Sequence, residues 1–359
     1  MDETARLLAG SAERVFGVAR AAEATGGWDE AAWQEAEAAG FPLAMVSEER
    51  SGFALAGGDA LQVVRIAARN VVPLPLAETM VANWLADVCG LESRGGISTI
   101  AIPDATAPLR VEKTRDGWHL SGVSRRVPYG RHAASVLVSA VGREGPVLCL
   151  VDEGGWTSGP SSNMAGEPRD DLFFETSVRP DSIVARGDAA EVLMAVGAAA
   201  RTVQMAGALE RALDETVTYA RDRVQFGRPI AKFQAIQQNI AFFAATVAAA
   251  GAAADLAAEA LVHDIDVAAI AAAKSRVGEA AGTGASIAHQ VHGAIGFTYE
   301  HPLHLATRKL WAWRDEFGNE SWWNRLLGER LIAGGGDRLW PSITALGTPR
   351  TPMDKEDAP

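Results

Sequence analysis

The stretch RDRVQFGRPI, residues 221–230, separates two long segments in which apolar residues recur at helical spacing. Residues 189–219 form the segment before it, and residues 236–247 continue the pattern after it. Gly227 and Pro229 interrupt helical structure between the two segments. We therefore expect two helices joined by a tight, basic connection, which on its own could be a helix corner with a solvated edge. This connection presents the side chains of Arg223, Gln225 and Phe226.

The composition of the chain excludes some classes of partner. The chain has 359 residues, enough for two or three structural domains with a large buried core. Its net charge of −12 argues against general binding to nucleic acid or to an anionic membrane. Cys89 and Cys149 match no metal or redox spacing and suit a reducing compartment. The first residues are acidic and lack the basic region of a signal peptide, so we expect a cytoplasmic protein.

An alanine-rich run at residues 241–262 is long enough to suggest a membrane span. Asp255 and Glu259 interrupt it, and alanine is only weakly apolar. A packed bundle helix is therefore the better interpretation of this run.

The pattern of the chain changes twice, from helix to strand and back. Helical segments are predicted at residues 2–24, 28–39, 59–69 and in a segment that follows PLPLAET (73–79) and ends near Gly90. Apolar runs of strand length follow at 97–102, 118–121, 135–141, 147–151 and 171–174 and predict an antiparallel domain of five to eight strands. Residues 188–331 are helical again.

This order predicts an α+β protein with segregated helical and strand regions. The expected domains are an N-terminal helical domain at 1–94, a middle β domain at 95–186 and a C-terminal helical bundle at 187–333. The Gly-, Pro- and charge-rich residues 334–359 are expected to form a tail with little structure.

Four motifs carry a resemblance to a known family. RVQFGRPI (223–230) with FQAIQ (233–237), QVHGAIGF (290–297), WWNRLLGER (322–330) and PLPLAET (73–79) resemble segments of the acyl-CoA dehydrogenase family. The resemblance is strong over residues 189–331. It implies an N-terminal helical domain, a middle antiparallel β-barrel and a C-terminal four-helix bundle.

The resemblance also implies a reaction, the FAD-dependent α,β-desaturation of an acyl-CoA thioester. In the family a carboxylate takes the α-proton while the flavin takes the β-hydride, and an electron-transfer flavoprotein-like acceptor is the expected partner. In homotetrameric members the flavin ring lies in one subunit and the ADP half contacts the neighbouring bundle.

The half of the site that would hold ADP is present in this chain. Arg223 offers a forked donor for pyrophosphate oxygens. Glycines in the second motif would let the backbone approach the cofactor. The expected cofactor-binding residues are Arg223, Gln225, Phe226, Gln290, Gly293 and Gly296.

The half that would hold the flavin ring departs from the family pattern. The family's TEPxAGSD-like loop corresponds to IPDATAPL, residues 102–109, and its Trp-Ile-Thr triplet falls near RRVPYG, residues 125–130. Neither motif is retained. Val127, Pro128 and Tyr129 could form a packing wall instead.

The expected positions of the catalytic base carry no carboxylate. When the chain is aligned on Arg325 and Arg330, the family's usual glutamate falls on Gly318, and a position used by a minority of members falls near Gly197. Loss of a general base costs about 10²–10⁴ in rate. Two nearby carboxylates, Glu316 and Glu320, are weak candidates, since both could equally belong to a solvated, charged helix start.

Two further clusters stand out in the C-terminal part. His289, His292, His301 and His304 could share a face, but no cysteine or well-spaced carboxylate completes a metal site, so we expect no metal. The tryptophans at 311, 313, 322 and 323 are expected to serve core or subunit packing, with a wall for a large ring substrate as the alternative.

These features are similar to those of the subunit that lacks the catalytic glutamate in heteromeric α2β2 bacterial acyl-CoA dehydrogenases of steroid degradation. The resemblance implies a homologous partner subunit and an acyl-CoA substrate. Two alternatives remain: a self-sufficient homo-oligomer that uses Glu316 or Glu320 as base, and a flavin-free scaffold or binding protein on the same fold.

Overall fold

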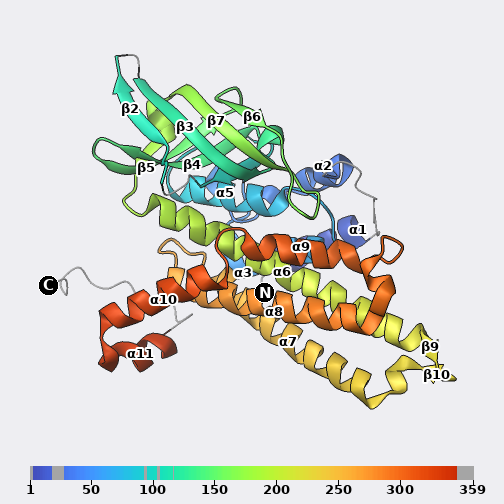
Figure 1. The fold of residues 1–359 in the computed structure, drawn as a ribbon. Coiled ribbons are helices and arrows are strands. Elements are labelled where there is room, and N and C mark those ends of the chain that lie inside the picture. The colour runs from blue at the N-terminus through green and yellow to red at the C-terminus, as the bar shows by residue number, and fades with distance from the viewer. Residues whose placement is uncertain (1–2, 18–27, 93–94, 103–105, 116, 346–359) are drawn as a thin grey trace.

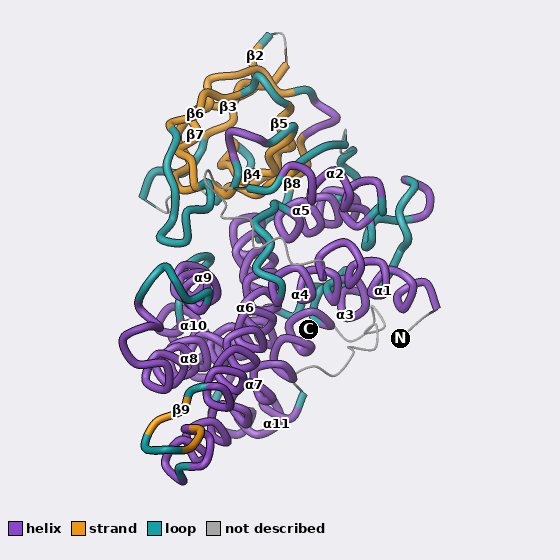
Figure 2. The backbone as a smooth tube through the Cα atoms, turned by 90° about the vertical axis from the view of Figure 1, so that its right-hand side faces the viewer, coloured by secondary structure: helices purple, strands orange, loops and turns teal. Residues whose placement is uncertain are grey.

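The structure, a computed structural model, describes residues 3–17, 28–92, 95–102, 106–115 and 117–345. Its strands gather at one end, and long helices form the other end (Figures 1 and 2). The chain has N-terminal helices, a middle β domain and a C-terminal helical bundle, as the sequence predicts.

The described residues of the N-terminal region form five α-helices. They are α1 (Glu3–Gly17), α2 (Glu30–Ala38), α3 (Gly57–Ala60), α4 (Gln62–Arg69) and α5 (Leu76–Val88). Asp29 begins α2 as its N-cap, because its side chain accepts a hydrogen bond from the backbone N–H of Ala32 at 3.0 Å. The predicted helices are confirmed, except that residues 18–24 of the first one lie outside the described residues.

The middle domain is one eight-stranded sheet. Its strands are β1 (Ser98–Ala101), β2 (Arg110–Thr114), β3 (Gly117–Pro128), β4 (Ser135–Gly142), β5 (Gly145–Asp152), β6 (Trp156–Gly159), β7 (Arg169–Val178) and β8 (Ile183–Ala185). The order is β6-β7-β3-β2-β4-β5-β8, with β1 beside β4. Most pairings are antiparallel, but β4 runs parallel to both β1 and β2, which the sequence pattern does not predict. The long excursion through β2 and β3 supplies the crossover that a parallel pairing of β1 with β4 needs.

The C-terminal region is helical. It contains α6 (Ala189–Asp222), the two-residue strands β9 (Val224–Gln225) and β10 (Arg228–Pro229), α7 (Gln234–Glu259), α8 (Val267–His292), α9 (Leu303–Asp315) and α10 (Glu320–Gly334). The sequence predicts little structure after residue 334, whereas a short helix, α11 (Leu339–Thr344), is present. Residues 346–359 of the expected tail lie outside the described residues.

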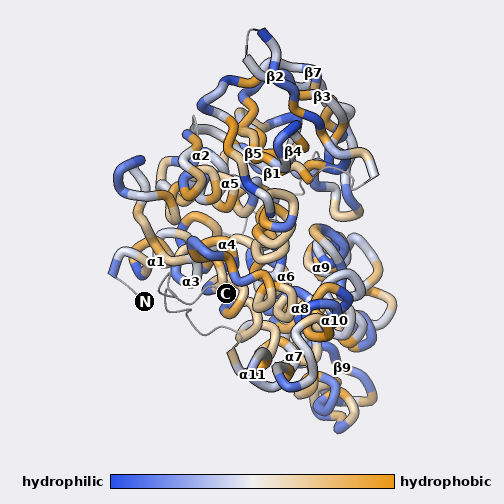
Figure 3. Tube along the Cα trace, turned by 90° about the vertical axis from the view of Figure 1, so that its left-hand side faces the viewer, coloured by the Kyte–Doolittle hydropathy of each residue, from blue (hydrophilic) through white to orange (hydrophobic). Residues whose placement is uncertain are grey.

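Helix α6 joins two hydrophobic cores. Its first half, with Val192, Val196 and Val203, packs in a core shared with the N-terminal helices and the sheet. Its second half, with Leu209 and Ala212, belongs to a core between α7, α8 and α9. Figure 3 shows mostly hydrophobic colours along this central helix. The helix therefore fixes the β domain relative to the bundle, and the candidate site lies along it.

Two helices are long and apolar enough to cross a membrane by length and composition alone, α6 and α7. In α6, 94% of the apolar window is buried inside the protein, as in a core helix. In α7 the corresponding share is 39%, because one alanine-rich face of this helix is exposed.

Candidate functional site

The first predicted cofactor segment forms an exposed hairpin. Arg223 is the C-cap of α6, and β9 pairs with β10 across the turn. Phe226 has a positive φ of 52° and is 92% exposed. Figure 1 shows this hairpin at the end of the bundle away from the β domain. This hairpin therefore lies far from the chain's own sheet.

The second predicted segment lies beside the first. Gln290 is exposed near the end of α8, and Gly293 follows it with a φ of 63° and no atom within 4 Å of an added Cβ. Tyr219, four residues before Arg223, stacks on His292 with ring centroids 4.5 Å apart. The structure thus brings the two segments together at one end of the bundle.

These residues fit the ADP half of a flavin. An exposed arginine, two exposed amide side chains, an exposed aromatic ring and an open glycine backbone suit a pyrophosphate and its nucleoside. The sixth predicted residue, Gly296, is buried, and a Cβ there would lie 2.8 Å from the Cβ of His292. Gly296 therefore allows close packing against His292 inside the turn after α8, and it is not part of the exposed surface formed by the other five residues.

Histidines near this segment pack as rings. His292 lies 4.5 Å from His301, and His289 stacks on Phe297 at 4.3 Å, measured between centroids. Burial lowers the pKa of His292 to about 4, so its imidazole is neutral near pH 7. No group of three or more His, Cys, Asp or Glu side chains in the described part of the chain is placed to hold a metal.

In the region expected to hold the flavin ring, the described residues line a small cavity. Its volume is about 180 Å³, and it lies between the sheet and the start of the bundle. It is lined by Ile100, Ile102, Arg125, Arg126, Val127, Pro128, Met194, Asp315, Glu316 and Phe317. Small-molecule sites are about 300–1,000 Å³, so the volume that these residues enclose is below that range. Residues 103–105 of the neighbouring loop lie outside the described residues.

Both positions expected for a catalytic base are blocked. At Gly197 an added Cβ would lie 2.4 Å from Cδ1 of Phe317, so the phenyl ring fills the space of a side chain. At Gly318 the φ is 85°, and an added Cβ would lie 2.8 Å from Nε1 of Trp323. At each of these two positions a larger side chain would collide with a neighbouring aromatic ring, which is Phe317 at Gly197 and Trp323 at Gly318.

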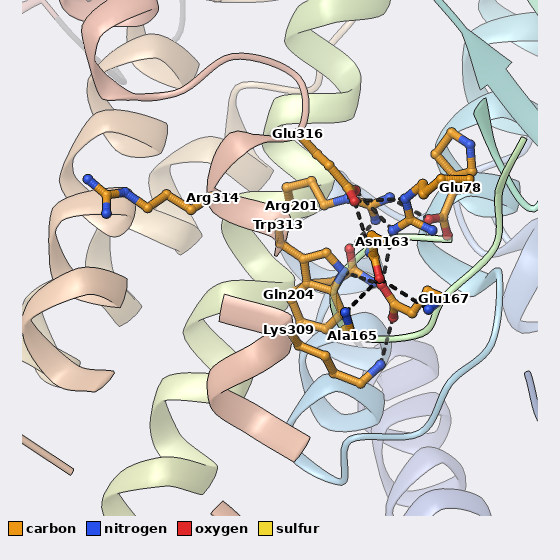
Figure 4. A network of polar contacts seen from close by, with 12 residues as sticks. Glu78, Asn163, Ala165, Glu167, Arg201, Gln204, Lys309, Trp313, Arg314 and Glu316 are labelled. Atoms are coloured by element: carbon orange, nitrogen blue, oxygen red, sulfur yellow. Dashed lines mark hydrogen bonds and ion pairs between the residues drawn. The ribbon is translucent and has the colours of Figure 1, made fainter. Parts of the chain in front are cut away.

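Glu316 takes part in a buried network of charges (Figure 4). Nε of Arg169 donates to its Oε1 and Nε of Arg201 to its Oε2, both at 2.7 Å. Arg201 also donates to Glu78 at 2.6 Å, and Arg169 to Glu167 at 3.0 Å. The network therefore ties α5, the strand β7, α6 and the end of α9 together.

The network is balanced in charge. Lys309 donates to Glu167 at 2.6 Å, which gives three carboxylates and three cations. Burial alone would raise the pKa of the Glu316 carboxyl, but Arg169 and Arg201 outweigh burial and hold this pKa below its usual value. A carboxylate with both oxygens engaged and a lowered pKa is a poor general base.

The interpretation of Glu316 as part of a solvated helix start is wrong, because its side chain is only 8% exposed. Glu320 does begin a helix, as the first residue of α10 after the N-cap Asn319. Its Oε1 accepts a hydrogen bond from Nε of Arg314 at 2.7 Å. Glu316 lines the small cavity, but both of its carboxylate oxygens accept hydrogen bonds from arginines, and Glu320 is not among the residues that line it.

A buried lysine holds the loop between these glutamates. Lys274 on α8 donates to the carbonyls of Arg314 at 2.7 Å and Gly318 at 2.9 Å. Nε1 of Trp323 donates to the carbonyl of Phe317 at 3.0 Å. The loop that places Phe317 over Gly197 is therefore fixed from both sides.

Sequence reasoning missed most of the network. Glu78, Glu167, Arg169 and Lys309 lie in four different elements or loops, and only the fold brings them together. Arg201 did carry a signal, because a charged residue within an otherwise apolar helical run needs a buried partner.

Residues 187–331 match the family described as acyl-CoA dehydrogenase, C-terminal domain. The acyl-CoA dehydrogenase IpdE2 of Mycobacterium tuberculosis is 31% identical over 283 residues, which cover 78% of this chain and 80% of that protein. A variant of the Tcur3481–Tcur3483 steroid ACAD is 26% identical, with a TM-score of 0.81 and coverage of 92% of this chain and 98% of that chain. The ChsE4–ChsE5 complex from Mycobacterium tuberculosis is similar in fold, with a TM-score of 0.83, 23% identity and the same coverage.

Proposed function

The chain belongs to the acyl-CoA dehydrogenase family, and from this premise we propose that it is the base-less partner subunit of a heteromeric acyl-CoA dehydrogenase. In this proposal the chain supplies the ADP-binding surface for a flavin whose ring lies in a homologous subunit. That second subunit carries the base and desaturates the acyl-CoA.

The observation that carries the proposal is the lack of an available carboxylate at the expected positions of the base. Phe317 fills the space over Gly197, and Glu316 is held by two arginines. Such a site cannot take a proton from a substrate. The exposed hairpin with Arg223, by contrast, offers its groups to another molecule.

The relatives support a partner of the same family. Two of the similar solved proteins, ChsE4–ChsE5 and Tcur3481–Tcur3483, are named as pairs of differently named chains. Because one of them is named a steroid ACAD, we propose a thioester with a bulky, steroid-derived acyl group as the substrate of the assembly.

Members of the family bind FAD. Bound FAD would accept the substrate's hydride in the partner's ring site. In this chain Arg223, Gln225 and Gln290 would hold its ADP half by hydrogen bonds, and Phe226 would cover it. From the partner's flavin the electrons would pass to an electron-transfer flavoprotein-like acceptor.

Purification alone and with the homologous subunit tests the proposal. We expect the chain alone to be colourless and inactive, and the co-expressed complex to be yellow, active and to hold fewer flavins than subunits. Absorbance at the flavin band, with protein quantified by amino-acid analysis, gives the stoichiometry. One flavin per chain and turnover of an acyl-CoA by the chain alone would establish the self-sufficient alternative. A colourless complex would favour the flavin-free scaffold.

A further inference from the structure

The open end of the β domain contains a larger cavity than the one at Phe317. Its volume is about 680 Å³, which lies within the range of small-molecule sites. Figure 1 shows β2 at the end of the β domain farthest from the bundle. The mouth of a curved sheet is a frequent place for a ligand, since strand ends there enclose space that side chains do not fill.

The cavity exists because β2 leaves β4. Their pairing consists of Arg110 opposite Val141, while β4 continues with β5 to the hairpin at Gly142 and Gly145. From Val111 to the end of β2, the edge that faces β4 has no strand partner among the described residues. The gap between β2 and this hairpin opens into the sheet.

The walls of the cavity are mostly apolar. Val111 at its base is buried, and Val147 and Ile183 are half-buried on the opposite wall. Trp118, also half-buried, gives one side a flat aromatic surface. This lining suits an apolar chain or ring and disfavours a fully hydrated ligand.

The inner face of the mouth carries a positive charge. Lys113 pairs with Trp118 across the strands and shares a face with Val111, because side chains two apart on a strand point the same way. Its Nζ lies 5.8 Å from the centroid of the Trp118 ring. Glu112 lies on the opposite face of β2 with its cross-strand partner His119, but it also lines the cavity and places one negative charge there.

The remaining charges lie at the rim. Arg143 and Glu144 are neighbours in the exposed β4–β5 turn and cancel in net charge, and Arg110 is exposed beside the mouth. Lys113, Arg143 and Arg110 have no ion pair within the described part of the chain. The charged side chains that line the mouth therefore carry a net positive charge, although the whole chain has a net charge of −12.

We propose that this cavity is a second ligand site, for an amphipathic carboxylate. The apolar body of the ligand lies between Trp118 and Ile183, and its carboxylate pairs with Lys113. Part of the free edge of β2 stays available for the ligand's polar groups.

Fluorescence titration with dansyl-undecanoate tests this proposal on the full chain. The primary amide of the same probe is the uncharged comparison. Saturable binding of the carboxylate, about tenfold tighter than the amide, is expected, because a charge-assisted bond is lost with the amide. Lys113→Met should abolish that tenfold preference and leave the amide unchanged. Ile183→Trp, which fills the cavity, should weaken both probes.

A matched variant excludes the cavity at Phe317 as the place of binding. Arg126→Met removes an exposed cation there and should leave both titrations unchanged. Lys113 is exposed, so its substitution leaves the fold intact even if Ile183→Trp does not. Absence of saturable binding, equal affinity for the two probes, or carboxylate binding unaltered by Lys113→Met would overturn the proposal.

Discussion

The phenyl ring of Phe317 lies in the space that a side chain at Gly197 would need, with Cδ1 of the ring 2.4 Å from an added Cβ. Arg201, one turn further along α6, also lies over this ring, with its Cζ 5.4 Å from the ring centroid. The ring therefore packs against both the backbone of α6 and a buried guanidinium. A side chain larger than that of glycine at position 197 would therefore collide with this ring.

A carboxylate placed at the family's usual base position should not create activity. Gly318→Glu requires a φ of 85° and displacement of Trp323, so we expect a loss of about 2–4 kcal/mol in the free energy of unfolding and no turnover. Urea unfolding and an acyl-CoA assay measure the two effects. Gly328→Glu is the matched control, because this helical glycine has no atom within 4 Å of an added Cβ. Turnover by purified Gly318→Glu would contradict the blocked site.

We expect Glu316 to stabilise the fold and not to act as a catalytic base. Glu316→Gln leaves Arg169 and Arg201 without their shared carboxylate, and breaking a buried ion pair from one side costs about 3–5 kcal/mol. The control Glu191→Gln removes an exposed pair with Arg330, worth about 0–1 kcal/mol. Urea unfolding distinguishes them. If Glu316→Gln unfolds like the wild type but turnover by the purified chain is lost, Glu316 is a base and the proposal fails.

The fold could be predicted because its signals are local. The periodicity of residues 189–219 shows α6, and the apolar runs between Gly, Pro, Asp and Asn show the strands. The parallel pairing of β1 with β4 could not be predicted, because strand order depends on contacts distant in sequence. The helix at Leu339–Thr344 was missed because its short apolar pattern lies among Gly, Pro and charged residues.

The candidate site could be predicted only where a motif is continuous. Arg223 and Gln290 lie in two such motifs, and the Tyr219–His292 stack brings these segments together. The buried partners of Glu316 come from β7 and α6, so its role depends on the tertiary fold. Spacing along the sequence places Glu316 beside the base position but carries no information on those arginines.

The exposed β9–β10 hairpin should contribute to FAD binding by the complex. Arg223→Ala removes a charge-assisted hydrogen-bond donor worth roughly 1.5–3 kcal/mol, so we expect FAD to bind the complex about 10–100-fold more weakly. Flavin release followed by fluorescence measures this affinity. Arg276→Ala, on an exposed part of α8, is the control and should leave the affinity unchanged. Equal affinity in the two variants would place the ADP half elsewhere.

The exposed alanine face of α7 should form a subunit contact. Ala245, Ala248 and Ala252 are exposed on one side of this helix, and small residues allow helices to approach closely. A buried carboxylate there would be unpaired, so Ala248→Glu should shift a dimer or tetramer towards the monomer. Light scattering at micromolar concentration measures the mass. Ala190→Glu, exposed at the start of α6, should not shift it. A monomeric wild-type chain, both alone and mixed with its homologous subunit, would contradict the expected assembly.

Acid should destabilise the bundle through His292. Its Nδ1–H donates to the carbonyl of Ala288 at 2.7 Å, and its ring packs against Tyr219 and His301. His289 and Glu215 are titratable neighbours of His292 and His301, respectively.

Burial lowers the pKa of His292 from 6.5 to about 4, so between these values the unfolded chain binds a proton that the folded chain does not. The free energy of unfolding therefore falls as the pH drops from 6.5 to 4, with roughly 1–3 kcal/mol from this residue. His292→Phe keeps a ring on Tyr219 but removes the titration, so its urea-unfolding free energy should vary less over this range and be parallel to the wild type above pH 7. Identical slopes between pH 4 and 6.5 in the two proteins would show that His292 is not the titrating group.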